Sequence, residues 1–163
     1  MMPITGLSIR PAVLEERAAL EALQWRASLM WEEDRDALLA HPDAITLPVA
    51  QIGEGRVFVA EMANKAVGFA VILPRPDGDA DLDGLFVELA IWQAGIGRRL
   101  VREAEMIAAR TAAGFLYVVT NHRAQGFYAA CGFALIGEEA TRFGIGLLMR
   151  KAIEADGPGR TER

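Results

Sequence analysis

The order in which strand-like and helix-like segments alternate is the feature that most limits the fold of this chain. Three strand-like segments follow one another between Arg56 and Val87: "RVFVAEM", "AVGFAVIL" and "ADLDGLFV", with "NK" (64–65) as a hairpin turn and "PRPDGD" as a loop. A helical stripe then runs from Gly95 to about Ala113 and leads to the buried-type strand "FLYVVT". Sequential hairpins combined with helical crossovers predict a mixed sheet covered by helices.

The remaining segments bring the expected total to about seven strands and about four helices. An initial strand, "GLSIRPA", precedes a helix from Val13 to about Trp31 and a shorter helix from Asp34 to Ala40, which Pro42 stops. The apolar face of the longer helix consists of Leu20, Leu23, Ala27 and Met30. After "FLYVVT", the helix "RAQGFYAA" closes at Cys131-Gly132, and "FALIGE" and "GIGLLMRKAI" form a final pair of strands. The fold class is therefore α+β.

The length and punctuation of the chain predict one domain. The chain has 163 residues, an ordinary length for a single core, and no repeat or linker divides residues 1–153. Residues 154–163 are polar and contain glycine and proline, so we expect a disordered tail.

Charge and composition exclude several classes of function. The net charge of −5 argues against nucleic acid as the main partner, because phosphate backbones bind to basic surfaces. The single cysteine and two histidines have no metal-ligand spacing, so no metal is expected. The first residues lack the pattern of a secretory signal, and no stretch approaches the ~18 apolar residues of a membrane span. A cytoplasmic protein that does not bind membranes is the expectation.

A strand, the glycine turn "QAGIGR" and a helix together suggest an anion site. The first amide groups of a helix lack partners within it, and the helix dipole places partial positive charge there. Gly95 and Gly97 let the backbone approach a ligand closely, and Arg98 and Arg99 add positive charge. A tight structural turn is the alternative for such a short motif. The spacing fits neither a dinucleotide fingerprint nor a nucleoside-triphosphate loop.

The segment "LDGLFVELAIWQAGIGRRLV" resembles the acyl-CoA-binding segment of the GNAT N-acyltransferase superfamily, in which Arg/Gln-x-x-Gly-x-Gly/Ala follows the fourth strand. Gly95 and Gly97 match the two small positions. Three residues depart from the pattern: Trp92 stands where Arg or Gln is usual, Gln93 is one place late, and Leu89 stands where many relatives have proline. The resemblance implies that the coenzyme diphosphate is held by Trp92, Gln93, Ala94, Gly95, Ile96, Gly97 and Arg98.

A second segment, "VVTNHRAQGFYAACGF", resembles the later motif of the same family, Asn-x-x-Ala-x-x-Phe-Tyr followed by Gly-Phe. The residues in register are Asn121, Ala124, Phe127, Tyr128, Gly132 and Phe133. Two motifs in the right order and spacing identify the chain as a member of the superfamily. The resemblance implies a GNAT-like, mostly antiparallel sheet and an N-acetyltransferase. The resemblance also implies that the enzyme transfers acetyl from acetyl-CoA, as co-substrate, to a primary amine by direct attack in a ternary complex.

Asn121, Phe127 and Tyr128 each allow two roles. Asn121 offers a donor and an acceptor to pantetheine, or it caps the following helix. Tyr128, with an ordinary pKa of about 10, donates a proton or a hydrogen bond to the departing thiolate, or it is a packed aromatic. Phe127 lies in the core or beside the coenzyme. Cys131 is interpreted as a small buried residue, because no base is evident beside it.

The strand before the glycine turn supplies further candidates. The resemblance implies that a backbone amide of Leu85, Phe86 or Val87 polarises the thioester carbonyl. Strand alternation places residues 81, 83, 85 and 87 on one face. Asp83 is the candidate base, with Asp81, His122 or water as alternatives, and a solvated strand end is the other interpretation of both aspartates.

The acceptor and the assembly are not determined by the sequence. The acceptor is a small-molecule amine or a peptide, and a homodimer through the closing strands is conceivable. The alternative function is a catalytically silent acyl-CoA-binding regulatory module. A regulator that binds another phosphate compound through the glycine turn is a third hypothesis, in which the segment around Tyr128 has no role.

Overall fold

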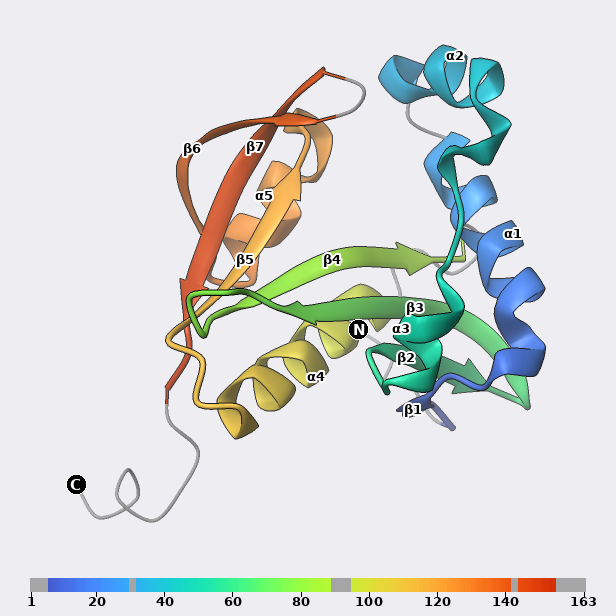
Figure 1. Ribbon diagram of the computed structural model, residues 1–163, viewed down its shortest axis with the longest axis horizontal. Helices are drawn as coiled ribbons and strands as arrows, with labels where there is room; N and C mark the ends of the chain where they lie inside the picture. The colour runs from blue at the N-terminus through green and yellow to red at the C-terminus, as the bar shows by residue number, and fades with distance from the viewer. Residues whose placement is uncertain (1–5, 30–31, 89–94, 142–143, 155–163) are drawn as a thin grey trace. The chain divides into compact units, whose positions relative to one another are not determined.

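The computed structural model describes residues 6–29, 32–88, 95–141 and 144–154 (Figure 1). The chain divides into two compact units. The first unit comprises Met1–Val71 and Gly84–Leu100, and the second comprises Ile72–Asp83 and Val101–Arg163. Residues 155–163, most of the expected tail, lie outside the described part, as do Met30 and Trp31 of the first expected helix.

The described residues contain a seven-stranded sheet in the order β1-β2-β3-β4-β5-β7-β6, in which β4 and β5 are parallel and the pairs β1-β2, β2-β3, β5-β7 and β7-β6 are antiparallel. The strands are β1 (Ser8–Pro11), β2 (Val57–Met62), β3 (Lys65–Pro74), β4 (Ala80–Val87), β5 (Phe115–Thr120), β6 (Ala134–Thr141) and β7 (Gly144–Ala152). The helices are α1 (Arg17–Leu29), α2 (Glu32–Ala40), α3 (Val49–Gly53), α4 (Ile96–Arg110) and α5 (His122–Ala130), with 3-10 turns at Leu14–Glu16 and Pro42–Ala44. This mixed, mostly antiparallel α+β architecture is the predicted one.

The structure adds one short helix to the prediction, and one hairpin turn lies a residue earlier than predicted. Five α-helices are present in the described part of the chain instead of about four, because the five-residue helix α3 follows Pro48. The β2–β3 turn lies at Ala63 and Asn64, with φ values of 51° and 62°, and Lys65 already begins β3. Two successive positive φ values are the geometry of a type I′ hairpin turn, which matches the twist of the flanking strands.

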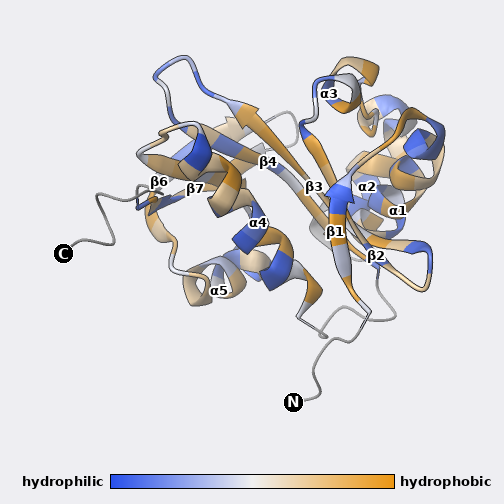
Figure 2. Ribbon diagram, turned by 90° about the horizontal axis from the view of Figure 1, so that it is seen from below, coloured by the Kyte–Doolittle hydropathy of each residue, from blue (hydrophilic) through white to orange (hydrophobic). Residues whose placement is uncertain are grey.

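The first unit buries one face of α1 together with the inner residues of β2 and β3. Leu20, Leu23 and Ala27 are buried as predicted from their helical spacing. Val59 and Phe69 are fully buried on the strands, and Figure 2 shows the hydrophobic colour of these strands. Each large apolar side chain removed from water in this way contributes roughly 1.5–3 kcal/mol to folding.

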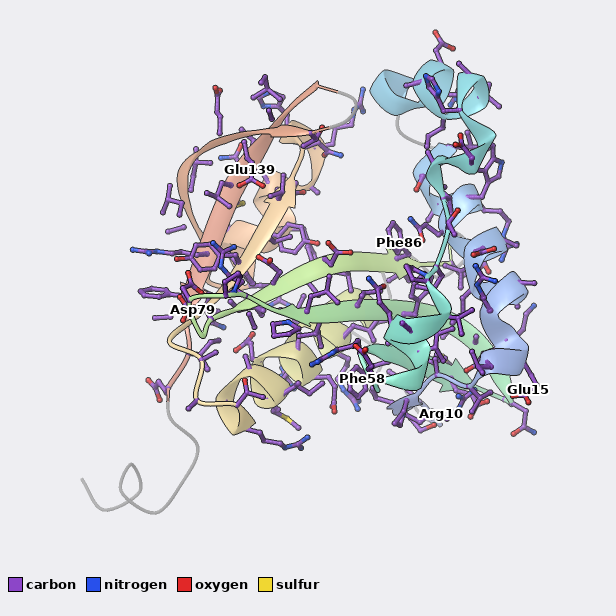
Figure 3. All side chains as sticks on the ribbon, in the orientation of Figure 1. Arg10, Glu15, Phe58, Asp79, Phe86 and Glu139 are labelled. Carbon is purple, nitrogen blue, oxygen red and sulfur yellow. The ribbon has the colours of Figure 1, made fainter. Side chains whose placement is uncertain are left out.

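The second unit contains the antiparallel group β5-β7-β6 and helix α5. Leu116 and Met149 are almost completely buried on β5 and β7. The Asp79 carboxylate, labelled in Figure 3, accepts hydrogen bonds from the amides of Gly114 (2.8 Å) and Phe115 (3.1 Å), which fastens the β3–β4 loop to the start of β5. The Lys151 ammonium donates to the Cys131 carbonyl (2.8 Å) at the end of α5, so this helix is fixed to β7.

None of the helices in the described part of the chain is both long and apolar enough to cross a membrane.

Candidate active site

The first turn of α4 has the geometry expected of an anion site. Gly95 has a φ of +88°, which a residue with a side chain adopts only with strain. The Gly95 carbonyl accepts the Arg99 amide (3.1 Å), so Ile96, Gly97 and Arg98 are the first three residues of the helix. The first amides of a helix and the helix dipole create positive potential at such an end. A helix start of this kind can attract an anion.

Buried apolar side chains anchor this turn within the first unit. Ile96 and Leu100 are fully buried, whereas Arg98 is exposed and Arg99 is half-buried. The first turn thus combines buried apolar side chains with two arginines that are at least partly exposed. Trp92, Gln93 and Ala94, the other predicted diphosphate ligands, lie outside the described residues, as does Leu89.

The end of β4 presents a backbone amide away from β3. The Glu88 amide donates to the Val67 carbonyl on β3 (2.8 Å). Successive amides of a strand point to opposite edges, so the Val87 amide points away from β3. Val87 is buried, while Leu85 and Phe86 are half-buried, and the Phe86 ring lies 5.2 Å from that of Phe69 (Figure 3). Of the neighbours Phe86 and Val87, Val87 has the amide directed away from β3.

The burial of β4 does not follow the simple alternation that the sequence suggested. Ala80 and Leu82 are buried, whereas Asp81 and Asp83 are not. Continued alternation would leave Val87 exposed, yet Val87 is buried. Gly84, Leu85 and Phe86 are all half-buried, so burial does not alternate over this part of the strand.

Tyr128 is an almost completely buried residue of α5. Its ring makes edge-to-face contacts with Phe127 (5.0 Å) and Phe133 (5.5 Å), and only 7% of the residue is exposed. No hydrogen bond of its hydroxyl is present within the described residues, where no completely enclosed side-chain oxygen or nitrogen lacks a partner, so the phenol oxygen is not fully enclosed. Burial raises the pKa of this phenol, which keeps it protonated at neutral pH.

Asn121 is the N-cap of α5. Its Oδ1 atom accepts the Ala124 amide (2.9 Å), which stabilises the helix start by about 1 kcal/mol. The capping alternative is therefore confirmed, and the two Nδ2 hydrogens are not used by this bond. His122 begins α5 with an exposed side chain. Phe127 is half-buried against Tyr128, and Cys131 is buried as interpreted from the sequence.

The two aspartates of β4 have different environments. Asp81 forms an ion pair with Arg75 (2.8 Å), whose guanidinium also stacks on the Tyr117 ring at 3.9 Å. Partial desolvation, together with the charge of Asp81, raises the pKa of Asp83, although part of its side chain remains exposed. No cluster of three or more His, Cys, Asp or Glu side chains within the described ranges has the geometry of a metal site.

The structure groups the predicted residues into two sets. Gly95, Ile96, Gly97 and Arg98 lie in the first unit with Leu85, Phe86 and Val87. Asp83, Asn121, Phe127 and Tyr128 lie in the second. Gly68, which also lies in the first unit, was not predicted as a site residue.

The sequence over residues 17–133 matches the family described as the acetyltransferase (GNAT) family. The match covers more than half of the chain and includes both motifs. The chain belongs to the acetyltransferase (GNAT) family. It is accordingly an enzyme of the GNAT N-acetyltransferase type, which transfers an acyl group from a CoA-type substrate.

Solved structures share the GNAT fold at low sequence identity. A GCN5-related N-acetyltransferase from Rhodopseudomonas palustris is 23% identical with a TM-score of 0.75, covering 93% of this chain and 99% of that one. The PaiA N-acetyltransferase of Thermoplasma acidophilum, in complex with coenzyme A, is 17% identical with a TM-score of 0.73, and the match covers 90% of this chain and 98% of that one. A putative streptothricin acetyltransferase of Bacillus anthracis, in complex with acetyl coenzyme A, is 20% identical with a TM-score of 0.56, and the match covers 60% of this chain and 62% of that one. No curated protein is similar enough in sequence to count as a match.

Proposed function

We propose that this GNAT enzyme transfers the acetyl group of acetyl-CoA to a primary amine by direct attack in a ternary complex. The first turn of α4 carries the proposal, because its amides and dipole suit a doubly charged diphosphate. Structural relatives bound to coenzyme A and to acetyl coenzyme A support the choice of co-substrate. The acceptor is a small-molecule amine or a peptide, and the cytoplasmic location and the homodimer stay predictions.

The binding role belongs to backbone groups. The amides of Ile96, Gly97 and Arg98 hold the diphosphate, and the resemblance assigns Trp92, Gln93, Ala94 and Gly95 to the same ligand. The Val87 amide donates to the thioester carbonyl oxygen and stabilises the negative charge that develops there. Backbone donors on buried elements cost little reorganisation during the reaction.

The reaction forms one bond and breaks one. The amine nitrogen bonds to the carbonyl carbon, the carbon–sulfur bond breaks with its electron pair on sulfur, and one proton passes in net from nitrogen to sulfur. Tyr128 donates a hydrogen bond to the sulfur as its charge grows. A thiol resembling cysteine has a pKa of about 8.5, well below that of this phenol, so the hydrogen bond matters more than complete transfer of the phenolic proton.

The attacking amine must lose a proton. An ordinary alkylamine with a pKa near 10.4 is neutral in roughly one molecule per few thousand at pH 7. Asp83 is the proposed acceptor, directly or through water, because its pKa is raised and Asp81 is held by Arg75. His122 and water are the remaining candidates for this step.

A catalytically silent coenzyme-binding module is less well supported. Such a module has no use for a phenol whose ring is packed on two sides and whose hydroxyl is not fully enclosed and has no partner among the described residues. That arrangement favours a donor that awaits a substrate atom.

Thermal unfolding and thiol release test the proposal. Acetyl-CoA should raise the melting temperature, because a ligand that binds only the folded state stabilises it, and ATP or NAD at equal concentration should not. A screen of primary amines with acetyl-CoA should then detect thiol release with at least one acceptor class. Stabilisation by ATP or NAD without stabilisation by acetyl-CoA would exclude the proposed co-substrate.

The Asn121→Asp substitution separates the two roles of this residue. Aspartate caps a helix as well as asparagine, so the melting temperature should stay close to that of the wild type. The substitution removes both Nδ2 donors and adds a charge, so the KM for acetyl-CoA should rise about tenfold if Asn121 binds pantetheine. Asn64→Asp in the β2–β3 turn is the matched control. An unchanged KM would leave Asn121 with the capping role alone.

A further inference from the structure

Gly68 lies on β3 at a point where the first unit has no room for a side chain. A Cβ atom built there would lie 2.9 Å from the Phe86 carbonyl oxygen on β4. It would also lie 3.2 Å from Cδ1 of Leu100 and 3.4 Å from Cγ2 of Ile96, both in the first part of α4. Glycine inside a strand often marks such a close approach of another backbone.

The Phe86 carbonyl determines where the next amide points. No cis peptide bond occurs in the described chain, and in a trans peptide the carbonyl of one residue and the amide of the next point in opposite directions. Since the Phe86 carbonyl oxygen approaches Gly68, the Val87 amide points away from it. The hydrogen bond from the Glu88 amide to the Val67 carbonyl gives the Val87 amide the same outward direction independently.

We infer that Gly68 is a positioning residue for catalysis: the space it leaves accommodates the Phe86 carbonyl and thereby aims the Val87 amide at the thioester. The inference rests on the proposed function. The first contact of a methyl group at position 68 is a backbone oxygen, which moves only with its peptide plane. The same methyl group reaches Leu100 and Ile96 at longer distances, so α4 is disturbed less than β4.

Gly84 shows why the direction of this contact matters. A Cβ atom at Gly84 would meet the Phe86 ring at 2.8 Å, which is a side chain and not the peptide group. Of the two glycines beside Phe86, only Gly68 therefore bears on the backbone that carries the proposed donor.

The carbonyl carbon of bound acetyl-CoA, labelled with ¹³C, reports on this donor without an acceptor. A hydrogen bond to the thioester oxygen withdraws electrons from the carbon, so its resonance should move downfield when acetyl-CoA binds the wild type. Gly68→Ala should lose at least about half of that movement, because the donor is displaced. The affinity for free CoA should stay within about threefold, since the diphosphate ligands lie on α4.

Two controls separate positioning from general stability. Gly137→Ala on β6 adds a methyl group where no atom lies within 4 Å, and Val59→Ala lowers stability by opening a cavity on the fully buried face of β2. Both should keep the wild-type carbonyl shift. If Gly68→Ala does not fold, the ¹⁵N-labelled wild type still provides the test, because the Val87 amide resonance should differ between the CoA and acetyl-CoA complexes.

The outcomes distinguish this inference from the proposed function. If acetyl-CoA does not bind the wild type, the proposed function fails. If it binds and the carbonyl shift is equal in the wild type and Gly68→Ala, or the Val87 amide resonance does not respond to the acetyl group, Gly68 has no positioning role.

Discussion

The Tyr128→Phe variant should lose on the order of 100-fold in kcat while its affinity for acetyl-CoA stays nearly unchanged. The substitution removes one oxygen atom that makes no hydrogen bond within the described residues and leaves the contacts of the ring with Phe127 and Phe133 in place. The melting temperature should therefore change little. The loss falls on kcat because the proposed hydrogen bond strengthens only as charge develops on sulfur.

Steady-state kinetics with an amine found in the thiol-release screen measures this effect. The matched control is Tyr117→Phe, in which the removed hydroxyl accepts a hydrogen bond from Arg150 (3.3 Å) on the β5–β7 face. The control should keep its kcat. Because burial raises the pKa of the Tyr128 phenol, the ratio of the wild-type kcat to the kcat of Tyr128→Phe should be constant from roughly pH 7 to pH 9. A kcat equal to that of the wild type would remove Tyr128 from the mechanism.

The Gly97→Glu variant should bind CoA at least about 100-fold more weakly than the wild type. Gly97 is buried at the second position of α4, where a longer side chain occupies the space next to the amide groups. The added carboxylate also competes with the diphosphate for the positive helix end. A negative charge in the first turn favours the helix itself, so the charge alone should not unfold the protein.

Calorimetric titration with free CoA measures the loss, and thermal unfolding checks that the variant is folded. Gly53→Glu is the matched control, since this glycine of α3 is exposed and no atom lies within 4 Å of its added Cβ. If Gly97→Glu is too unstable, the exposed Arg98→Glu substitution reverses charge at the next position and should also weaken binding. Normal affinity in both variants would refute the placement of the diphosphate.

Much of the fold follows from local patterns in the sequence. The strands 80–87 and 115–120 have the predicted bounds, since each is an apolar run between clear breakers. The helix from Ile96 to Arg110 has the predicted apolar stripe, with Leu100, Val101 and Ala104 fully buried. Helix α3 was missed because five residues are too few to show a helical period.

The candidate site was predictable where a short-range rule determines the backbone. The Gly95 turn and the Asn121 cap are such cases, because a helix start needs its own residue types within a few positions. The loss of alternation in burial at Gly84–Phe86 and the closeness of Gly68 to Phe86 depend on how β3, β4 and α4 pack, which the sequence does not specify. A lone glycine within the apolar run "AVGFAVIL" was the one available signal for Gly68.

A crystal structure of the full chain with coenzyme A tests the central claim most directly, namely that the first turn of α4 binds the coenzyme diphosphate. We predict diphosphate oxygens within hydrogen-bonding distance of the Ile96, Gly97 and Arg98 amides, at about 2.7–3.2 Å. Coenzyme A bound with its diphosphate anywhere other than at this turn would contradict the account.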